Sequence, residues 1–156
     1  MAYAVRGLDP APFAPLFALD EASLAPHRAV KLRAAAGTGF PCRVSLRDAA
    51  DGDELELVHH VHHDVETPYR SAFAIYVRKD AAKAAVFIDR CPPVFAGRHI
   101  ALRGYDAAGM LEAARLALPG EADAGIRALF AVPAIAYIDA HNAAHGCFAA
   151  RIERHG

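Results

Sequence analysis

The stretch AIAYIDAHNAAHGCFAARIER, residues 134–154, decides the fold prediction because it reads as a β-hairpin. Small or apolar residues recur at every second position of 134–141 and again at every second position of 147–154. Successive strand residues point to opposite faces of a sheet, so the two apolar sets must face the same way. This parity predicts a loop over residues 142–146, in which Gly146 takes a positive φ.

The predicted pairing of this hairpin brings several reactive side chains to one face. His141 lies directly opposite Cys147, with Cβ atoms about 5 Å apart. Tyr137 lies opposite Arg151, with Asp139 between them on the same face. A histidine beside a cysteine favours a thiolate nucleophile or a soft metal site.

Asn142 follows this histidine directly in the sequence. Its side-chain amide can orient an imidazole ring, as an amide does in some thiol hydrolases. The alternative is a sheet face whose polar residues simply meet solvent. The sequence leaves both interpretations open.

Residues 54–70, ELELVHHVHHDVETPYR, place four histidines on a predicted strand. His60 and His62 share one face at the H-x-H spacing, from which two imidazoles can reach one metal ion. His59 and His63 are four residues apart, roughly 13 Å along a strand, and cannot share an ion. A third ligand for the first pair has to come from elsewhere in the fold. The alternative is that these histidines contact water at the end of a strand.

Cys42 and Arg43 come at the end of a predicted loop, residues 35–42. A guanidinium can hold a carboxylate or phosphate with two donors, so Arg43 is a candidate for binding a small anionic ligand. Tyr69 adds a hydroxyl in the turn ETPYRS, residues 66–71, at the entrance of the next strand. The chain contains neither GxxxxGK[ST] nor GxSxG, which argues against a P-loop and a serine nucleophile. Surface arginine and ordinary turn chemistry are the alternative here.

The order of predicted elements indicates an α+β fold with a mainly antiparallel sheet, a short N-terminal helix and one or two helices packed on the sheet. Strands are predicted at residues 27–34, 42–46, 54–62, 72–79, 98–105, 134–141 and 147–154. Helical segments are predicted at residues 7–17, 19–27, 80–87 and 121–131. Residues 110–118 have helix-favouring composition, but their position after the turn at 106–109 suggests a return strand.

Composition limits the function classes. The chain has 156 residues, is 54% hydrophobic and carries a net charge of −1, which fits a single domain over residues 1–156. Interspersed charges argue against the basic face that nucleic-acid binding requires. No polybasic patch and no apolar run of about 20 residues points to a membrane. Three cysteines without a CxxC motif, and a start without a signal-peptide pattern, favour free thiols in the cytoplasm.

Five segments taken together resemble a known bacterial family, the domain of unknown function 1203. They are GLDPAPFAPLFAL (7–19), FPCRVSL (40–46), TPYRSAFAIYVR (67–78), LRGYDAAGM (102–110) and AYIDAHNAAHGCFAARIER (136–154). The resemblance implies a single small soluble protein of about this length and carries no established activity.

The family motifs fall on a restricted set of positions in this chain. They are Cys42, Arg43, His62, Thr67, Pro68, Tyr69, His141, Asn142, Gly146 and Cys147. A tyrosine is expected where His60 stands, so the resemblance favours His62 alone over the H-x-H pair. It also supports the strand interpretation of residues 110–118.

Three functions follow from these residues, with no cofactor identified and enzymatic activity left open. The first is a small-molecule enzyme or ligand-binding protein with a polar pocket. Its expected catalytic residues are Cys147, His141, His62 and Cys42, and its expected substrate-binding residues are Arg43, Tyr69, Asn142 and Arg151. The second is a zinc or other soft-metal site built from Cys42, Cys147 and one or two histidines. The third is a structural module that forms a homodimer through an exposed sheet edge.

Overall fold

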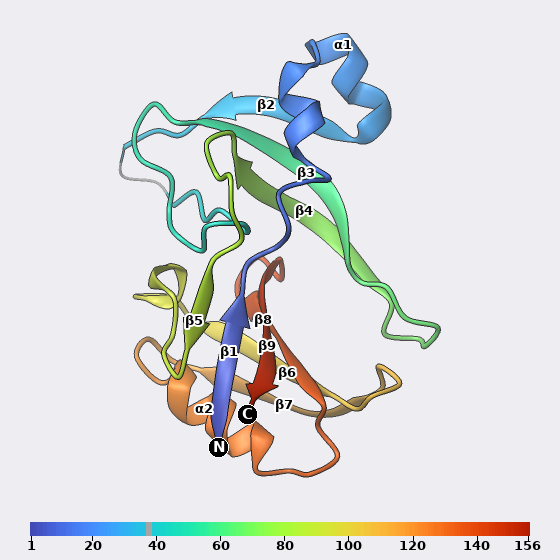
Figure 1. Ribbon diagram of the computed structural model, residues 1–156, viewed down its shortest axis with the longest axis vertical. Coiled ribbons are helices and arrows are strands. Elements are labelled where there is room, and N and C mark those ends of the chain that lie inside the picture. The colour runs from blue at the N-terminus through green and yellow to red at the C-terminus, as the bar shows by residue number, and fades with distance from the viewer. Residues whose placement is uncertain (37–38) are drawn as a thin grey trace.

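The alternating segments of the sequence pair into two antiparallel sheets, which confirms the predicted α+β class (Figure 1). The computed structural model describes residues 1–36 and 39–156. Its strands are β1 Ala2–Arg6, β2 Ala29–Arg33, β3 Glu54–His63, β4 Ser71–Arg78, β5 Val86–Ile88, β6 Ile100–Tyr105, β7 Leu111–Ala117, β8 Tyr137–Asn142 and β9 Phe148–His155. Its helices are α1 Glu21–Leu24 and α2 Ala122–Phe130, with 3₁₀ turns η1 Ala14–Ala18, η2 Ala25–His27 and η3 Pro93–Phe95. None of the helices in these ranges is long and apolar enough to cross a membrane.

The six-stranded sheet contains both ends of the chain, in the order β5-β1-β9-β8-β6-β7. Ile138 and Ile152 pair across β8 and β9 and are both buried in the larger hydrophobic core. Ile126 and Leu129 of α2 belong to the same core, so this helix covers the apolar face of the sheet. The sequence predicts that the apolar residues of the two strands face the same side of the sheet. The pairing of Ile138 with Ile152 in the core confirms this prediction.

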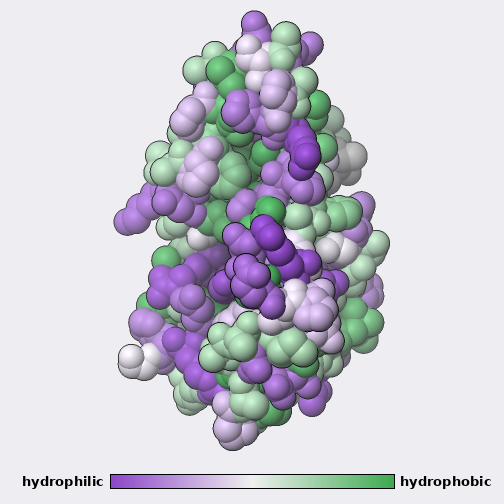
Figure 2. All heavy atoms as spheres, turned by 90° about the vertical axis from the view of Figure 1, so that its right-hand side faces the viewer, coloured by the Kyte–Doolittle hydropathy of each residue, from purple (hydrophilic) through white to green (hydrophobic). Residues whose placement is uncertain are grey.

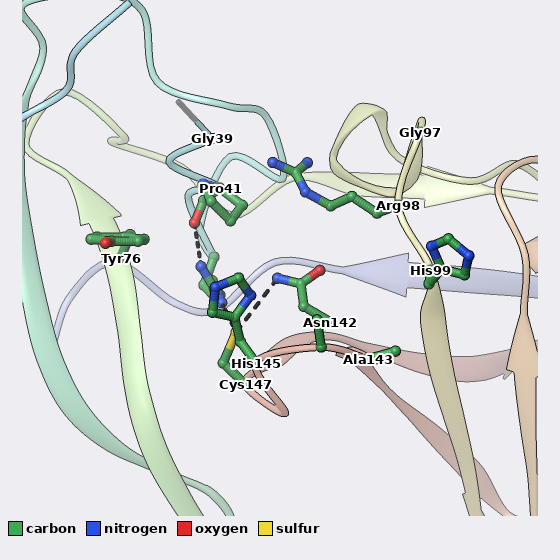
Figure 3. Close-up of a pocket in the computed structure, with 12 residues that line it drawn as sticks. Gly39, Pro41, Tyr76, Gly97, Arg98, His99, Asn142, Ala143, His145 and Cys147 are labelled. Carbon is green, nitrogen blue, oxygen red and sulfur yellow. Dashed lines mark hydrogen bonds between the residues drawn. The ribbon is translucent and has the colours of Figure 1, made fainter. Parts of the chain in front are cut away.

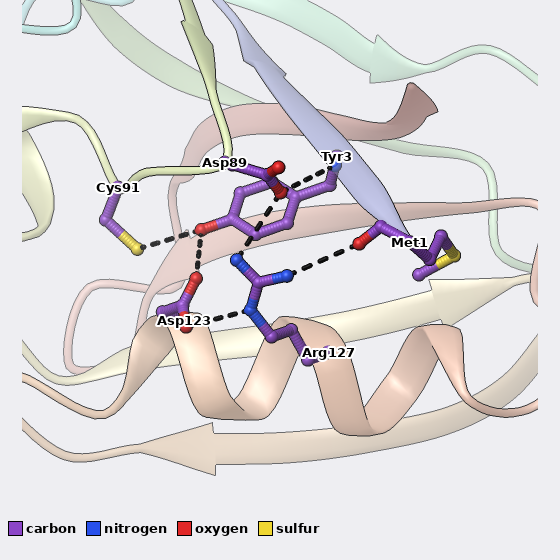
Figure 4. Close-up of polar contacts among 6 residues, drawn as sticks. All are labelled: Met1, Tyr3, Asp89, Cys91, Asp123 and Arg127. Carbon is purple, nitrogen blue, oxygen red and sulfur yellow. Dashed lines mark hydrogen bonds and ion pairs between the residues drawn. The ribbon is translucent and has the colours of Figure 1, made fainter. Parts of the chain in front are cut away.

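A polar network fastens β1 to α2 (Figure 4). The Tyr3 hydroxyl donates to Asp123 Oδ1 at 2.6 Å and lies 3.8 Å from Cys91 Sγ. The Arg127 guanidinium lies over the Tyr3 ring at 5.1 Å and is paired with Asp123 and Asp89. Burial is the largest cause that raises the pKa of both Tyr3 and Cys91, so both groups stay protonated at neutral pH. Cys91 is thus a thiol rather than a thiolate.

The three-stranded sheet, β2-β3-β4, carries a second hydrophobic core under the N-terminal helices. Phe13, Leu24 and Ile75 are among its buried members. Asp20 caps α1 by accepting a hydrogen bond from the Ser23 amide at 2.8 Å, and this helix lies within the segment 19–27 that the sequence predicts to be helical. The short N-terminal helix of the predicted fold is therefore present.

Residues 42–46 do not form the predicted strand. Isolated bridges join Pro41 to Asp48 and Cys42 to Tyr76, and the segment between them turns back, with Leu46 at a φ of 53°. The segment crosses from one sheet to the other, so its backbone groups bond to several elements instead of following one ladder. Of the predicted loop at 35–42, residues 37 and 38 lie outside the described residues.

Two other predictions have different outcomes. Residues 80–87 do not form the predicted helix. The end of this segment instead belongs to β5, Val86–Ile88, which pairs with β1 and which the sequence did not predict. Residues 111–117 form a strand, which confirms the hairpin interpretation of 110–118. Pairing with β6 outweighs the helix preference of these residues.

Glu56 is a buried carboxyl group in the second hydrophobic core. It is fully buried, and neither side-chain oxygen has a hydrogen-bond partner among the described residues. It shares a strand face with Val58 and pairs with Val77, and both valines belong to this core. Burial raises the pKa of Glu56 to about 7, and the nearby Lys31 offsets this only in part. The Glu56 carboxyl is therefore a buried titratable group without a hydrogen-bond partner among the described residues.

We expect Glu56→Gln to become increasingly stabilising, relative to the native chain, as the pH rises. A raised carboxyl pKa means that the folded state holds a proton that the unfolded chain releases. The native chain therefore loses stability as the pH rises from 4.5, the usual pKa of the carboxyl group, to about 7, its pKa in the folded chain. The loss is about 1.4 kcal/mol per pH unit and roughly 3 kcal/mol in total. Urea unfolding of both chains between these pH values measures the difference.

Glu54→Gln provides the matched control on the same strand. Lys79 is the main cause that lowers the pKa of Glu54. Removing the Glu54 carboxyl should therefore change the pH dependence of stability in the opposite direction. Parallel pH profiles for Glu56→Gln and the native chain would show that Glu56 is not a buried titrating group.

Candidate functional site

A pocket of about 420 Å³ opens where the β8–β9 loop faces the crossing segment and the turn before β6 (Figure 3). Cys147, at the end of that loop, is 9% exposed, and its sulfur lies at the pocket wall. The lining residues are Gly39, Pro41, Arg43, Tyr76, Gly97, Arg98, His99, Asn142, Ala143, Ala144, His145 and Cys147. Three residues predicted for the site, at positions 43, 142 and 147, thus share one cavity.

Arg43 is a buried guanidinium beside the cysteine sulfur. It is 2% exposed, and its Nε and Nη1 donate to the carbonyl oxygens of Phe148 at 2.7 Å and Pro41 at 2.5 Å. Its Nη2 donates to Cys147 Sγ at 3.1 Å. Burial lowers the pKa of Arg43, and Cys147 is the first of the causes that raise it. An arginine stays protonated in proteins, so the cation is fixed next to the sulfur.

Asn142 supplies a second donor to the same sulfur. Its Nδ2 lies 3.5 Å from Cys147 Sγ, and its backbone N–H donates to the Cys147 carbonyl oxygen at 2.9 Å. The Gly146 amide closes the loop by donating to the Asn142 carbonyl oxygen at 2.8 Å. Gly146 has a φ of 78°, as predicted, which is a conformation that glycine adopts without strain. The tight loop therefore holds the sulfur between two side-chain donors.

The predicted pairing of His141 with Cys147 is wrong. Asp139 pairs with Arg151 and Ala140 with Ala150, but His141 pairs with Phe148 because the register shifts between residues 140 and 141. This β-bulge leaves one residue of β9 without a partner and re-aims the side chains that follow. Asn142, rather than His141, therefore reaches the cysteine sulfur.

The predicted pairing of Tyr137 with Arg151 is also wrong, because the longer loop and the β-bulge together displace the register by two residues. Tyr137 pairs with Glu153. Arg151 instead forms a two-point ion pair with the buried Asp139, at 2.8 and 3.0 Å, and its guanidinium lies 4.4 Å from the Tyr137 ring centroid. The three side chains still share one face of the sheet.

His62 and His141 lie together behind the cysteine loop. Their ring centroids are 5.0 Å apart, and the His62 ring also stacks on Phe148 at 5.1 Å. His141 Nδ1 lies 3.0 Å from the Gly146 carbonyl oxygen, so Nδ1 carries the proton and Nε2 is a bare acceptor. His62 Nδ1 and His141 Nε2 are buried and have no partner among the described residues. Burial is the main cause that lowers the pKa of His62 to about 3 and that of His141 to about 4.

A comparison with protein families places this site in its context. The family described as "Protein of unknown function (DUF1203)" matches residues 39–154. The chain belongs to this family. No curated protein and no solved structure gives a significant match. The DUF1203 match includes Arg43, Asn142 and Cys147, whereas β1 and the N-terminal helices precede it.

A second bulge in the DUF1203 domain explains why two adjacent histidines reach the same sheet. The β3–β4 register shifts between Val61 and His63. The His62 ring contacts His141, while the His63 ring lies tilted against Tyr105 of β6, with ring centroids 4.1 Å apart. Adjacent residues of a regular strand would point to opposite faces. The predicted H-x-H pair does not hold as a unit, because His60 packs instead against the Phe13 ring at 5.6 Å.

The remaining predicted site residues lie outside the pocket. Cys42 is fully buried in the second hydrophobic core, where its sulfur accepts from the amides of Ser45 and Arg78 at 3.5 and 3.4 Å. Tyr69 lies in the β3–β4 turn and offers its carbonyl oxygen to His63 Nδ1 at 2.8 Å. The predicted residues thus divide into a pocket group, a buried histidine pair and structural positions.

Hydrophilic side chains gather near the middle of the face shown in Figure 2, around the level at which the two sheets meet. This distribution matches the polar contacts that β3 makes with the six-stranded sheet. Arg151 Nη2, for example, lies 3.4 Å from the His62 carbonyl oxygen. The junction between the sheets is therefore polar, whereas the two cores on either side are apolar.

Sequence reasoning missed three side chains of the pocket wall. Arg98 is held by Asp48 through two hydrogen bonds of 2.9 and 2.7 Å. His99 follows it on the same turn, and His145 lies in the β8–β9 loop. Lone charged residues in loops have no periodic signal, and only tertiary structure brings these segments together. The adjacent Arg-His pair at the start of the predicted strand 98–105 is the one local hint that the sequence offers.

The described residues contain no group of three or more histidine, cysteine, aspartate or glutamate side chains that could hold a metal ion. Cys42 and Cys147 lie in different surroundings, the first in an apolar core and the second at the pocket. The soft-metal interpretation of these cysteines thus lacks a ligand set in the described part of the chain.

The pair formed by the partly buried His62 and the buried His141 should destabilise the DUF1203 domain in acid. A lowered histidine pKa means that the unfolded chain takes up protons below about 6.5 while the folded chain does not, so stability falls as the pH drops toward 4. We expect His62→Phe, which keeps a ring against Phe148, to flatten this loss by up to about 1.4 kcal/mol per pH unit. Denaturant unfolding between pH 7 and 4 measures the slope.

His155, exposed at the end of β9, gives the control for the loss of a histidine that contacts neither ring. The slope of His62→Phe is compared with that of His155→Phe in the same buffers. An acid slope equal to that of the native chain in His62→Phe would refute the assignment.

Proposed function

We propose that this DUF1203 protein is a small-molecule enzyme or ligand-binding protein whose chemistry is carried by the thiolate of Cys147. One contact supports the proposal above all others: the buried Arg43 guanidinium donates to Cys147 Sγ at 3.1 Å. The pocket in front of the sulfur gives a small molecule access to it.

A buried cation needs a counter-charge, because removing it from water costs several kcal/mol. The Arg43 side chain contacts two carbonyl oxygens and one sulfur among the described residues. The sulfur of Cys147 is the member of this set that can carry a full negative charge. Asn142 adds a second, neutral donor at 3.5 Å. Donors aimed at a sulfur favour its anionic form, which is the nucleophile in thiol chemistry.

The roles in this proposal differ from those of a cysteine–histidine pair. Cys147 is the nucleophile, and Arg43 and Asn142 stabilise its charge. His141 acts as a positioning residue, because its Nδ1–H holds the Gly146 carbonyl oxygen one residue before the cysteine. His62 supports the same region by stacking on Phe148, whose carbonyl oxygen accepts from Arg43.

The pocket volume suits a small ligand. Its value of about 420 Å³ lies within the range of roughly 300–1,000 Å³ that is usual for small-molecule sites. Tyr76 and Pro41 give the wall an aromatic ring and an apolar edge, while the arginines and histidines supply polar groups. A few polar groups on a partly apolar wall are typical of a site that orients a small molecule.

Alkylation of the native protein with iodoacetamide at neutral pH tests the proposal. We expect Cys147 to react at least about tenfold faster than Cys91, whose pKa burial raises, since only the thiolate attacks. Cys42, with no exposed surface, should react last. Peptide mass spectrometry over a time course gives the rate for each cysteine separately.

Two variants separate the effect of charge from that of folding. Asn142→Ala removes the 3.5 Å donor but keeps the backbone bond to Cys147, so alkylation should slow several-fold in a folded chain. Arg43→Lys keeps the cation but loses the three-point geometry and should slow it further. Circular dichroism and thermal unfolding establish that each variant is folded. If Cys147 is no faster than Cys91 in the native chain, the proposal fails.

A further inference from the structure

We infer that the electrophile attacked by Cys147 is a small anionic disulfide, an inference that rests on the proposed function above. Two separate observations carry it. The first is the charge of the pocket wall, which selects an anion. The second is the absence of a proton-transferring partner on the sulfur, which selects the leaving group.

The pocket wall presents guanidinium groups and no carboxylate among its described lining residues. Arg43 and Arg98 both line it, together with His99 and His145, and none of the lining residues in the described chain has a carboxyl group. Asp48, which holds Arg98, is not among the lining residues. The Arg98 guanidinium lines the pocket and the Asp48 carboxylate paired with it does not, so an entering anion meets the cationic side of this ion pair, whereas a cation finds no carboxylate there.

Gly39 leaves room for the Arg98 guanidinium at the pocket wall. A Cβ atom on residue 39 would lie 2.6 Å from Arg98 Nη2, which is closer than real contacts allow. The guanidinium is also anchored from behind by the two oxygens of Asp48 and by the Val94 carbonyl oxygen at 2.8 Å. Arg98 is thus a fixed part of the wall, and its side chain is 23% exposed.

The groups bonded to Cys147 cannot move a proton. Arg43 does not deprotonate in proteins, and the amide of Asn142 is not an acid. His99 and His145 are exposed, and neither is hydrogen-bonded to the sulfur. Thiol hydrolases use a histidine on the cysteine to protonate a departing amine. Without such a partner, the favoured electrophile is one whose leaving group departs as a stable anion, and a thiolate does so.

The reaction that meets both conditions is thiol–disulfide exchange. The Cys147 thiolate attacks one sulfur of a disulfide RSSR, a new S–S bond joins Cys147 to that sulfur, and the old S–S bond breaks with its electron pair on the departing RS⁻. The described lining residues include no second cysteine, so the mixed disulfide waits for a different small thiolate, R′S⁻, from solution. That thiolate attacks the bound RS sulfur, forms RSSR′ and releases the Cys147 thiolate, so the net reaction converts RSSR and R′S⁻ into RSSR′ and RS⁻.

Disulfides that differ only in charge test the inference on the full chain. The probes are the dianionic 3,3′-dithiodipropionate, the neutral 2-hydroxyethyl disulfide and the dicationic cystamine. Each rate of mixed-disulfide formation at Cys147, followed by intact and peptide mass spectrometry, is divided by the rate of the same probe with N-acetylcysteine. We expect the corrected rate to fall by about tenfold or more from the dianion to the dication at low salt, and the order to weaken in high salt.

Arg98→Gln should reduce the ratio of the dianion rate to the neutral rate several-fold. Arg90→Gln is the matched control, because Arg90 is exposed and does not line this pocket. A ratio that responds equally to both variants would overturn the role of Arg98.

The outcomes distinguish the two proposals. A Cys147 that reacts with all three probes no faster than Cys91 overturns the proposed function and this inference together. A Cys147 that reacts fast with the neutral probe, without any charge order, overturns this inference alone. Fast reaction in the order dianion, neutral, dication supports both.

Discussion

The placement of the buried Arg43 guanidinium is the constraint on which the rest of the structure depends. The backbone N–H of Arg43 donates to the Tyr76 carbonyl oxygen of β4, and the Arg43 carbonyl oxygen accepts from the Leu8 N–H after β1. Its side chain reaches Phe148 in β9 of the other sheet. One residue therefore ties the three-stranded sheet, the six-stranded sheet and the N-terminal segment together. Because the crossing segment satisfies these bonds, it cannot also pair as a strand, and the pocket forms beside it.

Two β-bulges determine which polar side chains meet around this residue. The bulge in β3 lets His62 and His63 both face the six-stranded sheet, and the bulge at the end of β8 puts Asn142 rather than His141 on the sulfur. Each bulge changes the face of the residues beyond it. Regular strands would bury the same apolar residues but distribute the histidines and the amide differently. The site is therefore a product of strand irregularity at the sheet junction.

The sequence predicted those parts of the fold that depend on local periodicity. Alternation placed Ile138 and Ile152 on one buried face, and the turn at 106–109 indicated the strand that follows it. Residue types and spacing also selected Cys147 and Arg43. The register of the β8–β9 pair was beyond reach on both sides of Ala140, because an extra residue in one strand has no periodic signature and is decided by packing across the sheet. Arg98 was missed because only tertiary structure brings its turn to the cysteine loop.

A cysteine paired with arginine differs chemically from one paired with histidine. A histidine can take the thiol proton and return it to a leaving group, so it supports hydrolysis. Arginine keeps its own proton, so it can stabilise a thiolate continuously but cannot carry protons through a reaction. The bulge beside His141 therefore also changes which side chains contact the sulfur of Cys147. The bulge gives Cys147 an amide and a guanidinium as partners, and under the function proposed above this pairing favours exchange between sulfur atoms over cleavage of amides and esters.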